Sequence, residues 1–224
     1  MWRLYKYQPI TEQTLGNLAR RKLWASCPSA FSDPFEFRLQ RVANPPGIAE
    51  LRTQNPHLDS LSDAEFLDGA ITEFERTISS SGVVCFAQEP NETLMWSHYA
   101  DRHRGMCLGF SGETALEEVA VYPVEYSDDY PELTFKQIWH RNGLARVLWT
   151  KHSKWSYEKE FRLIRIEGNQ LIDYPGSLTR VIFGLRTSAS DQQAIRKVLA
   201  TESAVEYFKV VQDPAAYELH VVAN

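Results

Sequence analysis

The shortness of the apolar runs is the feature that most constrains how this chain folds. Val83-Val84-Cys85-Phe86 is typical: a short apolar run that follows the turn-forming residues Ser81 and Gly82. Such runs are characteristic of buried strands, whereas helices show longer periodic segments. The runs alternate with helical segments without a regular βαβ repeat, which predicts an α+β fold with a mixed or antiparallel sheet. The expected strands are residues 3–7, 23–26, 83–86, 105–110, 120–126, 161–166, 181–184, 207–211 and 218–222.

Helical segments are expected between these strands. Thr11 can cap a helix that carries Leu15, Leu18 and Ala19 on one stripe. Ser62-Asp63-Ala64-Glu65 fits a capping box within residues 47–80, a segment predicted to be a helical insert or lid. Its length of 224 residues suits one domain spanning residues 1–224. Further helices are predicted at residues 92–100, at 133–149 with an interruption near Asn142-Gly143, and from Ser188 onward.

Composition and missing motifs exclude several classes of protein. The net charge of −5 argues against general DNA binding, which needs a basic surface. Three widely spaced cysteines, without metal-binding spacing, indicate thiols in a reducing compartment. Neither a signal-like start nor an apolar run of the ~18 residues that a membrane helix needs is seen, so we expect a cytoplasmic protein without membrane association. P-loop, Rossmann, zinc-protease and serine-hydrolase signatures are likewise missing from the sequence.

Aromatic and charged residues occur together in two short segments of the first 40 residues. On the first predicted strand, Tyr5 and Tyr7 share one face while Lys6 points to the other. Tyr5 and Tyr7 are either core residues of an edge strand or the wall of a pocket for a planar ligand. In Phe31-Ser32-Asp33-Pro34-Phe35-Glu36, Asp33 and Glu36 lie on a turn braced by aromatic residues. That turn is either purely structural or a loop that orients a base or a ribose hydroxyl.

The helix predicted at residues 92–100 has an unusual mixed face. Met95 aligns with His98 and Tyr99, and Trp96 aligns with Tyr99. Trp96 and Tyr99 either line a pocket or pack in the core. His98 and His103 lack the i, i+4 spacing that favours a shared metal, and no metal site is predicted.

The densest group of polar and aromatic residues is Trp155-Ser156-Tyr157-Glu158-Lys159-Glu160-Phe161-Arg162. If this segment is extended, Glu158, Glu160 and Arg162 share one face of a strand. One interpretation is a structural ion pair of Arg162 with Glu158 or Glu160. The other is that one glutamate is catalytic and that Arg162 positions it or binds an anion.

Taken in order, these motifs resemble a bacterial family catalogued as domain of unknown function 2971. The resemblance rests on Leu4 to Tyr7, Leu23-Trp24-Ala25-Ser26, Asp33-Pro34-Phe35-Glu36, Met95 to Ala100 with Gly105, Trp155 to Arg162, and Ile182-Phe183-Gly184. Ser32 stands where the family usually has Asn. The resemblance covers nearly the whole chain but implies no particular activity.

A weaker similarity in layout is to small ADP-ribosyltransferase-like toxins. It implies an NAD-dependent transferase or glycohydrolase, with Tyr5 or Tyr7, then Tyr99, then Glu158 or Glu160 in the catalytic positions. NAD would be the substrate, bound with help from Lys6, Trp96, His98, Trp155 and Arg162, and the protein would act as a toxin or phage-defence effector. Two alternatives stay open: a non-enzymatic module that binds a nucleotide-like ligand, and a nuclease-like hydrolase using a divalent ion on Asp33, Glu36, Glu158 and Glu160.

Overall fold

The computed structural model describes residues 1–40, 49, 53, 62–138 and 141–224. Its central element is an eight-stranded sheet in the order β12-β11-β10-β4-β1-β3-β8-β5. All neighbouring strands are antiparallel except β10 and β11, which confirms the α+β prediction with a mostly antiparallel mixed sheet. The strands are β1 (Trp2–Gln8), β3 (Gly82–Ala87), β4 (Met106–Gly112), β5 (Val121–Pro123), β8 (Glu160–Arg165), β10 (Ser177–Phe183), β11 (Glu206–Gln212) and β12 (Leu219–Ala223).

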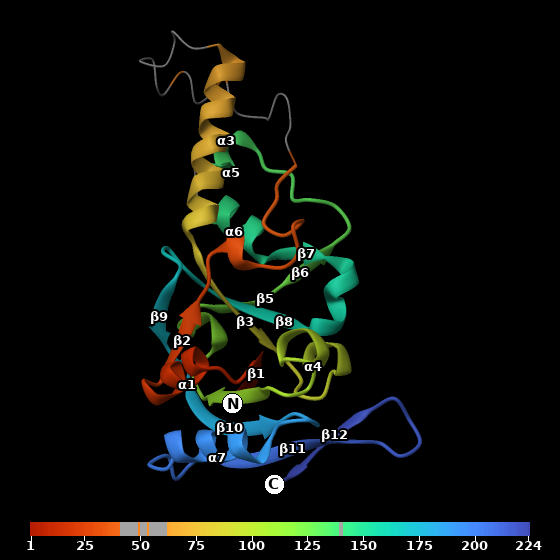
Figure 1. The fold of residues 1–224 in the computed structure, drawn as a ribbon. Coiled ribbons are helices and arrows are strands. Elements are labelled where there is room, and N and C mark those ends of the chain that lie inside the picture. The colour runs from red at the N-terminus through yellow and green to blue at the C-terminus, as the bar shows by residue number, and fades with distance from the viewer. Residues whose placement is uncertain (41–48, 50–52, 54–61, 139–140) are drawn as a thin grey trace.

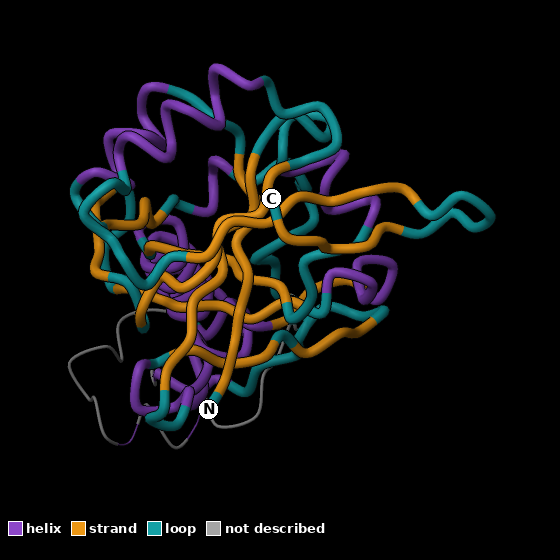
Figure 2. The backbone as a smooth tube through the Cα atoms, turned by 90° about the horizontal axis from the view of Figure 1, so that it is seen from below, coloured by secondary structure: helices purple, strands orange, loops and turns teal. Residues whose placement is uncertain are grey.

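In the described part of the chain, α-helices and two short strand pairs lie around this sheet (Figures 1 and 2). The helices of the described residues are α1 (Glu12–Ala19), α3 (Asp63–Ser80), α4 (Thr93–Tyr99), α5 (Phe135–Ile138), α6 (Arg141–Trp149) and α7 (Ala189–Val198). The small pairs are β2 (Lys22–Ala25) with β9 (Gln170–Asp173) and β6 (Glu125–Ser127) with β7 (Thr150–His152). Within the described part of the chain, no helix is both long and apolar enough to cross a bilayer.

One face of the sheet is covered by α1, α7 and the β2–β9 pair. Leu18 of α1, Leu23 of β2 and Ile195 of α7 pack there against sheet residues such as Leu4 and Phe86. The capping predictions explain how two of these helices begin: the side chains of Thr11 and Ser188 cap α1 and α7. Together these residues form the larger apolar core of the protein.

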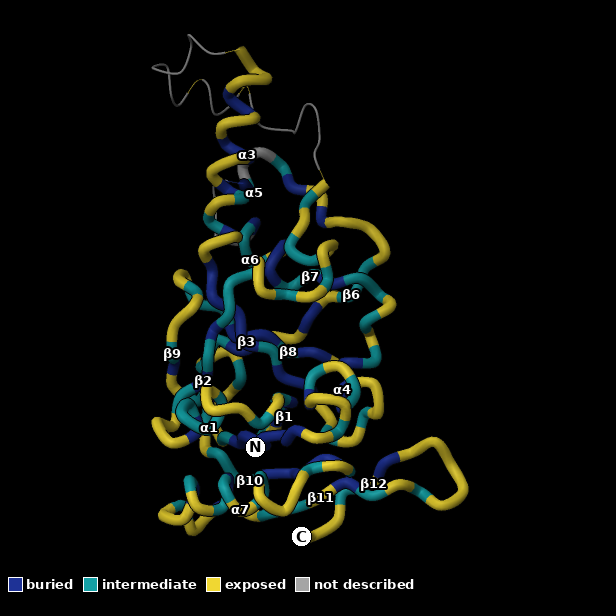
Figure 3. Tube along the Cα trace, in the orientation of Figure 1, coloured by how far each residue is buried: buried dark blue, intermediate teal, exposed yellow. Residues whose placement is uncertain are grey.

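The opposite face carries two separate apolar clusters. One joins α4 to β1, β4 and β10, and includes Trp96, Tyr5 and Tyr7. The other joins α3, α5 and α6 to β3, and includes Phe74 and Val83. In Figure 3 the strands β3 and β8 between these helices are largely buried. The gap between the two clusters is where a pocket forms.

The sheet is also loosely joined at this point. β1 pairs with β4 along its whole length, from Trp2 opposite Gly112 to Gln8 opposite Met106. With β3 it shares, among the described residue pairs, the single register position of Tyr5 opposite Ala87. Beyond that position the strands part, which opens the sheet beside Lys6.

Several element predictions were wrong in detail. Residues 120–126 form two strands in different sheets, β5 and β6, and not one. The stretch 133–149 contains two helices, α5 and α6, as the predicted interruption requires, but Asn142 and Gly143 lie inside α6 and not between the helices. The segment 155–162, considered above in an extended conformation, is extended only from Glu160, because residues 153–158 form a 3₁₀ helix. The short strands β7 and β9 were not predicted. The helical prediction for residues 47–80 is confirmed from Asp63 onward, including its capping box, whereas most of 47–61 lies outside the described residues.

Gly105 is expected to tolerate no side chain. A Cβ at this position would meet the Gln8 carbonyl oxygen and lie 2.9 Å from Ala100 backbone atoms, so the junction of α4, β1 and β4 would have to shift. We expect Gly105→Ala to lower the free energy of unfolding by about 1–3 kcal/mol, measured by urea denaturation. The control is Gly69→Ala in α3, where a Cβ meets nothing within 4 Å. That variant should be more stable than wild type by up to ~1 kcal/mol, and equal effects at both positions would contradict the packing argument.

Candidate functional site

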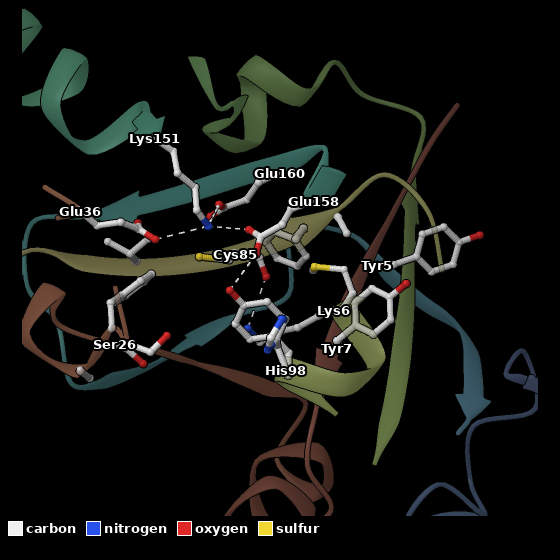
Figure 4. A pocket seen from close by; sticks show the side chains of 18 of the residues that line it. Tyr5, Lys6, Tyr7, Ser26, Glu36, Cys85, His98, Lys151, Glu158 and Glu160 are labelled. Atoms are coloured by element: carbon white, nitrogen blue, oxygen red, sulfur yellow. Dashed lines mark hydrogen bonds and ion pairs between the residues drawn. The ribbon is translucent and has the colours of Figure 1, made fainter. Parts of the chain in front are cut away.

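A pocket of about 380 Å³ lies between the two apolar clusters, on the face of the sheet that carries α3, α4, α5 and α6. Four predicted catalytic residues, Tyr5, Tyr99, Glu158 and Glu160, line it together. So do Lys6, Tyr7, His98 and Glu36, which were predicted to contact a ligand. Figure 4 shows the three glutamates pointing toward one end and Tyr5 and Tyr7 at the other. The wall is completed by Trp24, Ser26, Ala30, Phe31, Ser32, Val83, Cys85, Phe86, Ala87, Met95 and Lys151.

Strand register explains how distant residues reach the same face. Glu160 stands opposite Ala87, and Arg162 stands opposite Cys85. Ala87 in turn stands opposite Tyr5. Residues directly opposite in an antiparallel pair point to the same side of the sheet, so all five side chains project toward the pocket side. The alternation within residues 160–162 was predictable, but its alignment with Tyr5 is a property of the assembled sheet.

Lys151 is the centre of the polar end of the pocket. Its Nζ lies 2.5 Å from Glu158 Oε2, 2.8 Å from Glu160 Oε2 and 3.3 Å from Glu36 Oε1. The Lys151 side chain is 3% exposed. Charges removed from water require such pairing, because an isolated buried ion is strongly disfavoured. Lys151 therefore fixes three carboxylates, from the 31–36 loop, the 3₁₀ helix and β8, around one point.

Arg162 forms a second layer behind this point. It is fully buried, donating from Nε to Glu160 Oε1 at 2.7 Å and from Nη2 to Glu36 Oε2 at 2.5 Å. Its Nη1 donates to the Leu148 carbonyl oxygen at 2.6 Å. The predicted ion pair of Arg162 with Glu160 is thus present, while Glu158 pairs with Lys151 instead. Arg162 does not line the pocket, so its contacts indicate a positioning role.

A tight turn brings Glu158 into the site. The 3₁₀ helix Ser153–Glu158 ends at Lys159, whose φ of 43° lies in the left-handed region. This reversal lets Glu158 and Glu160 both reach Lys151 although Glu158 is not on the strand. The prediction that Glu158, Glu160 and Arg162 share a strand face was therefore wrong for Glu158. Glu158 Oε1 also accepts a hydrogen bond of 2.7 Å from the Tyr99 hydroxyl, which links the turn to α4.

The two glutamates in contact with Lys151 differ in acidity. Burial alone would raise the pKa of Glu160, but Arg162 and Lys151 outweigh burial and lower that pKa to about 2. Burial raises the pKa of Glu158, and the neighbouring Glu160 adds to the increase, against the opposing effect of Lys151. Three carboxylates face two cations, Lys151 and Arg162, so one negative charge has no matching cation. Glu158, which is not bonded to Arg162, is the carboxylate that most readily takes up a proton.

This difference predicts an acid-dependent loss of stability. The folded-state pKa of Glu160 is lowered from 4.5 to about 2, so its ionised form stabilises the fold above pH ~4.5, and that contribution disappears as the pH falls toward 2. At 1.36 kcal/mol per pKa unit the contribution is about 3 kcal/mol. Urea denaturation between pH 7 and pH 3 should show it in the wild type, and Glu160→Gln should lack this part of the pH dependence. An identical pH dependence in both proteins would contradict the ion-pair assignment.

Three other residues predicted to bind a ligand lie outside the lining of this pocket. Trp96 is fully buried, packing 5.2 Å from Tyr7 and donating to the Pro90 carbonyl oxygen, so it belongs to the core. The Trp155 indole Nε1 donates to Asp33 Oδ2 at 2.7 Å, which ties the 31–36 loop to the 3₁₀ helix. Trp155 also lies with its ring 5.1 Å from Lys151 Nζ. The structure thus gives Trp155 and Asp33 a bracing role near the site.

Sequence reasoning missed the central residue of the site. Lys151 follows directly on a predicted helix and precedes no recognisable motif. The available signal was one of charge: three glutamates and one arginine predicted to share a site require a second cation. Cys85 was also passed over as a buried thiol, yet it lines the pocket, and burial raises its pKa well above the usual value.

The divalent-ion alternative meets a specific obstacle. Of the four carboxylates proposed for it, Glu36, Glu158 and Glu160 already surround the Lys151 ammonium. Asp33 accepts hydrogen bonds from Trp155 and from the Phe35 amide. A buried ammonium at the focus of these oxygens occupies the place that a metal ion would need. The described residues contain no group of three or more His, Cys, Asp or Glu side chains arranged to hold a metal ion.

A comparison with family models found a match in the middle of the chain, which includes part of the pocket lining. The family model described as "Protein of unknown function (DUF2971)" matches residues 95–163. The matched segment contains Tyr99, Lys151, Glu158, Glu160 and Arg162, and so most of the polar end of the pocket. No curated protein and no solved structure matches the chain. The resemblance drawn from the motifs is confirmed over this segment: residues 95–163 are similar to the DUF2971 family.

Proposed function

We propose that this protein is an enzyme that cleaves the N-glycosidic bond of NAD or a related nicotinamide nucleotide. The observation that carries the proposal is the meeting of Tyr99, Glu158 and Glu160 at one end of a pocket with aromatic walls. Carboxylates beside an aromatic slot suit the chemistry of a planar base leaving a ribose. A volume of about 380 Å³ also lies within the usual range for small-molecule sites.

Aromatic side chains give the pocket a preference for planar ligands. Tyr5 and Tyr7 form one wall, and Trp24 and Phe31 lie elsewhere in the lining. His98 is exposed at the pocket and lies 6.3 Å, ring to ring, from Trp155. Aromatic faces are electron-rich, so they attract a cationic ring such as nicotinamide in NAD. This lining supports the choice of a nicotinamide base over an aliphatic substrate.

In the proposed reaction, the ionised Glu158 carboxylate stabilises the positive charge that develops on the ribose. The bond between C1′ of the ribose and the nicotinamide nitrogen breaks, and its electron pair leaves with nicotinamide. The oxocarbenium-like ribose is stabilised by the Glu158 carboxylate, which Tyr99 and Lys151 hold in place. Water, or an acceptor hydroxyl in a transferase, adds to C1′ and gives its proton to Glu158. Glu160 stays ionised throughout, because its pKa is low, and keeps Lys151 charged.

A binding module without turnover is the second candidate, and one observation favours it. Both oxygens of Glu158 already accept hydrogen bonds, one from Tyr99 and one from Lys151. A carboxylate held in this way can serve as a fixed part of a recognition site. In that case the aromatic pocket would bind a nucleotide-like ligand and leave it unchanged.

Nicotinamide release decides between these functions. Purified protein is incubated with NAD, alone and with protein or nucleic-acid acceptors, and nicotinamide is quantified by chromatography. The proposed enzyme should release nicotinamide in proportion to protein concentration. Stabilisation of the protein by NAD or ADP-ribose in thermal denaturation, without nicotinamide release under any condition, would establish the binding module instead. If the protein neither releases nicotinamide nor is stabilised by NAD or ADP-ribose, both functions are rejected.

A cytoplasmic toxin or phage-defence role belongs to the same proposal. Growth arrest on expression of the wild type tests that role.

A further inference from the structure

Lys6 is a cation that has no carboxylate partner among the described residues, and it lies where β1 and β3 stop pairing. Its side chain is half-buried and lines the main pocket. Its Nζ donates to the Cys85 carbonyl oxygen at 3.4 Å, a long hydrogen bond. Among the described residues, Lys6 has no carboxylate oxygen within 4.0 Å, in contrast to Lys151 with three. Burial lowers the pKa of Lys6, which is the direction expected for an ammonium that lacks a full counterion.

A second pocket of about 170 Å³ shares part of its wall with the first one. Both pockets are lined by Lys6, Trp24 and Ser26. The rest of the second lining is largely polar and comes from β1, from α1 and from the segments around them: Gln8, Gln13, Thr14, Asn17, Leu18, Lys22, Leu23, Leu108 and Tyr174. Lys6 therefore stands at the junction of two cavities, one aromatic and acidic, the other rich in amides and hydroxyls.

An unsatisfied hydroxyl marks this second pocket as a place for a ligand. The Tyr174 hydroxyl is buried and has no hydrogen-bond partner within the described structure. Its ring packs edge-on against Phe110 at 4.9 Å, so it is held in place. Buried polar groups are normally paired, and each exception calls for a cause such as a missing ligand. The hydroxyl has almost no accessible surface in the free structure, so it can donate to a ligand in the pocket once the pocket wall adjusts around that ligand.

We propose that the second pocket binds the nucleoside half of an anion-linked substrate and that Lys6 binds the phosphates between its two halves. The base to be released would lie beside Glu158, the diphosphate would pass Lys6 at the junction, and the second ribose or base would reach Tyr174 and Asn17. The substrate class is a dinucleotide or a nucleoside diphosphate derivative. This inference rests on the proposed function and specifies which part of the substrate each cavity takes.

Binding of ADP and of adenosine tests the subsite without any catalytic step. By isothermal titration, Lys6→Met should weaken ADP binding about 10- to 100-fold, the loss expected for one charge-assisted hydrogen bond. Adenosine has no phosphate, so its affinity should be unchanged in the same variant. The matched control is Lys209→Met, which removes an exposed lysine of β11 and should leave both affinities as in wild type. Equal ADP affinity in wild type and Lys6→Met, or no binding of either compound to wild type, overturns the proposal.

Tyr174→Phe separates a ligand contact from a structural one. Removing a hydroxyl that has no partner should not lower the free energy of unfolding of the free protein. It should weaken adenosine and ADP binding about threefold to tenfold. Loss of stability with unchanged affinity would show that the hydroxyl serves the fold and would overturn the subsite.

A wild-type measurement covers the case in which Lys6→Met does not fold. Lysines are acetylated with acetic anhydride, with and without ADP, and the products are mapped by mass spectrometry. ADP should protect Lys6 and leave Lys209 reactive, and an unprotected Lys6 overturns the proposal. If ADP binding depends on Lys6 but NAD is never cleaved, the subsite stands and the glycosidic function fails. If NAD is cleaved and Lys6→Met leaves KM unchanged, the function stands and the subsite fails.

Discussion

Glu158→Gln is expected to lower the rate of nicotinamide release about 100- to 10,000-fold while leaving the protein folded. This is the usual loss when a carboxylate that acts on the reacting atoms is neutralised. Glutamine is nearly the same size and can still accept the hydrogen bond from Tyr99. The substitution also removes one of three carboxylate charges that face two cations, so the free energy of unfolding should fall less than it does for Glu160→Gln. The rate is measured by chromatography of nicotinamide and the stability by urea denaturation.

Glu160→Gln is the matched comparison, because it should show the opposite balance. Glu160 bridges Lys151 and Arg162, so its neutralisation should destabilise the fold more than Glu158→Gln does. The pH profile adds a second test. Glu158 must be ionised to stabilise positive charge, and its pKa is raised, so kcat should increase as the pH rises through that pKa. Glu158→Gln should lack this increase in its residual activity. If Glu158→Gln keeps full activity, Glu158 is not the carboxylate that stabilises the positive charge on the ribose.

Arg162→Met is expected to lower the free energy of unfolding by about 3–5 kcal/mol, the largest stability effect of any substitution considered. Removing one member of a buried ion-pair network leaves the others buried without compensation. Here Glu36 and Glu160 would both lose Arg162, and the Leu148 carbonyl oxygen would lose its donor. Lys151 alone would then face three carboxylates. The effect is measured by urea or thermal denaturation at pH 7.

Arg165→Met provides the control on the same strand. Arg165 is half-buried at the end of β8 and donates to the Ile164 carbonyl oxygen at 3.2 Å. Substitutions at such positions usually change stability by less than ~0.5 kcal/mol. A double variant, Arg162→Met with Glu160→Gln, should recover part of the loss, because neutralising Glu160 removes one of the uncompensated charges. Equal effects of Arg162→Met and Arg165→Met would show that the buried network contributes little to stability.

The secondary structure near the site was predictable wherever a local signal was strong. Thr11 and Ser62 cap their helices as predicted, and the apolar run at residues 83–86 forms the buried strand β3. Prediction failed for short segments whose structure depends on distant partners. Thr150–His152 is a strand because Tyr126 and its neighbours pair with it, and nothing in its own three residues indicates that. The turn at Lys159 likewise needs a left-handed backbone conformation. Glycine is the usual sequence signal for that conformation, and the residue here is a lysine.

The candidate site shows the same division. The chemical types at the site were predictable from the residues alone: aromatic residues on β1, a tyrosine on α4, and glutamates with an arginine at residues 158–162. They follow from residue identity and from local periodicity, which depend on neighbours a few positions away. The contacts between distant segments were not predictable in this way: Lys151 joins Glu36, Glu158 and Glu160, Trp96 belongs to the core, and Lys6 lines two cavities. The physical reason is that buried charges are paired across the fold, so their partners are set by strand register and burial and not by distance along the chain.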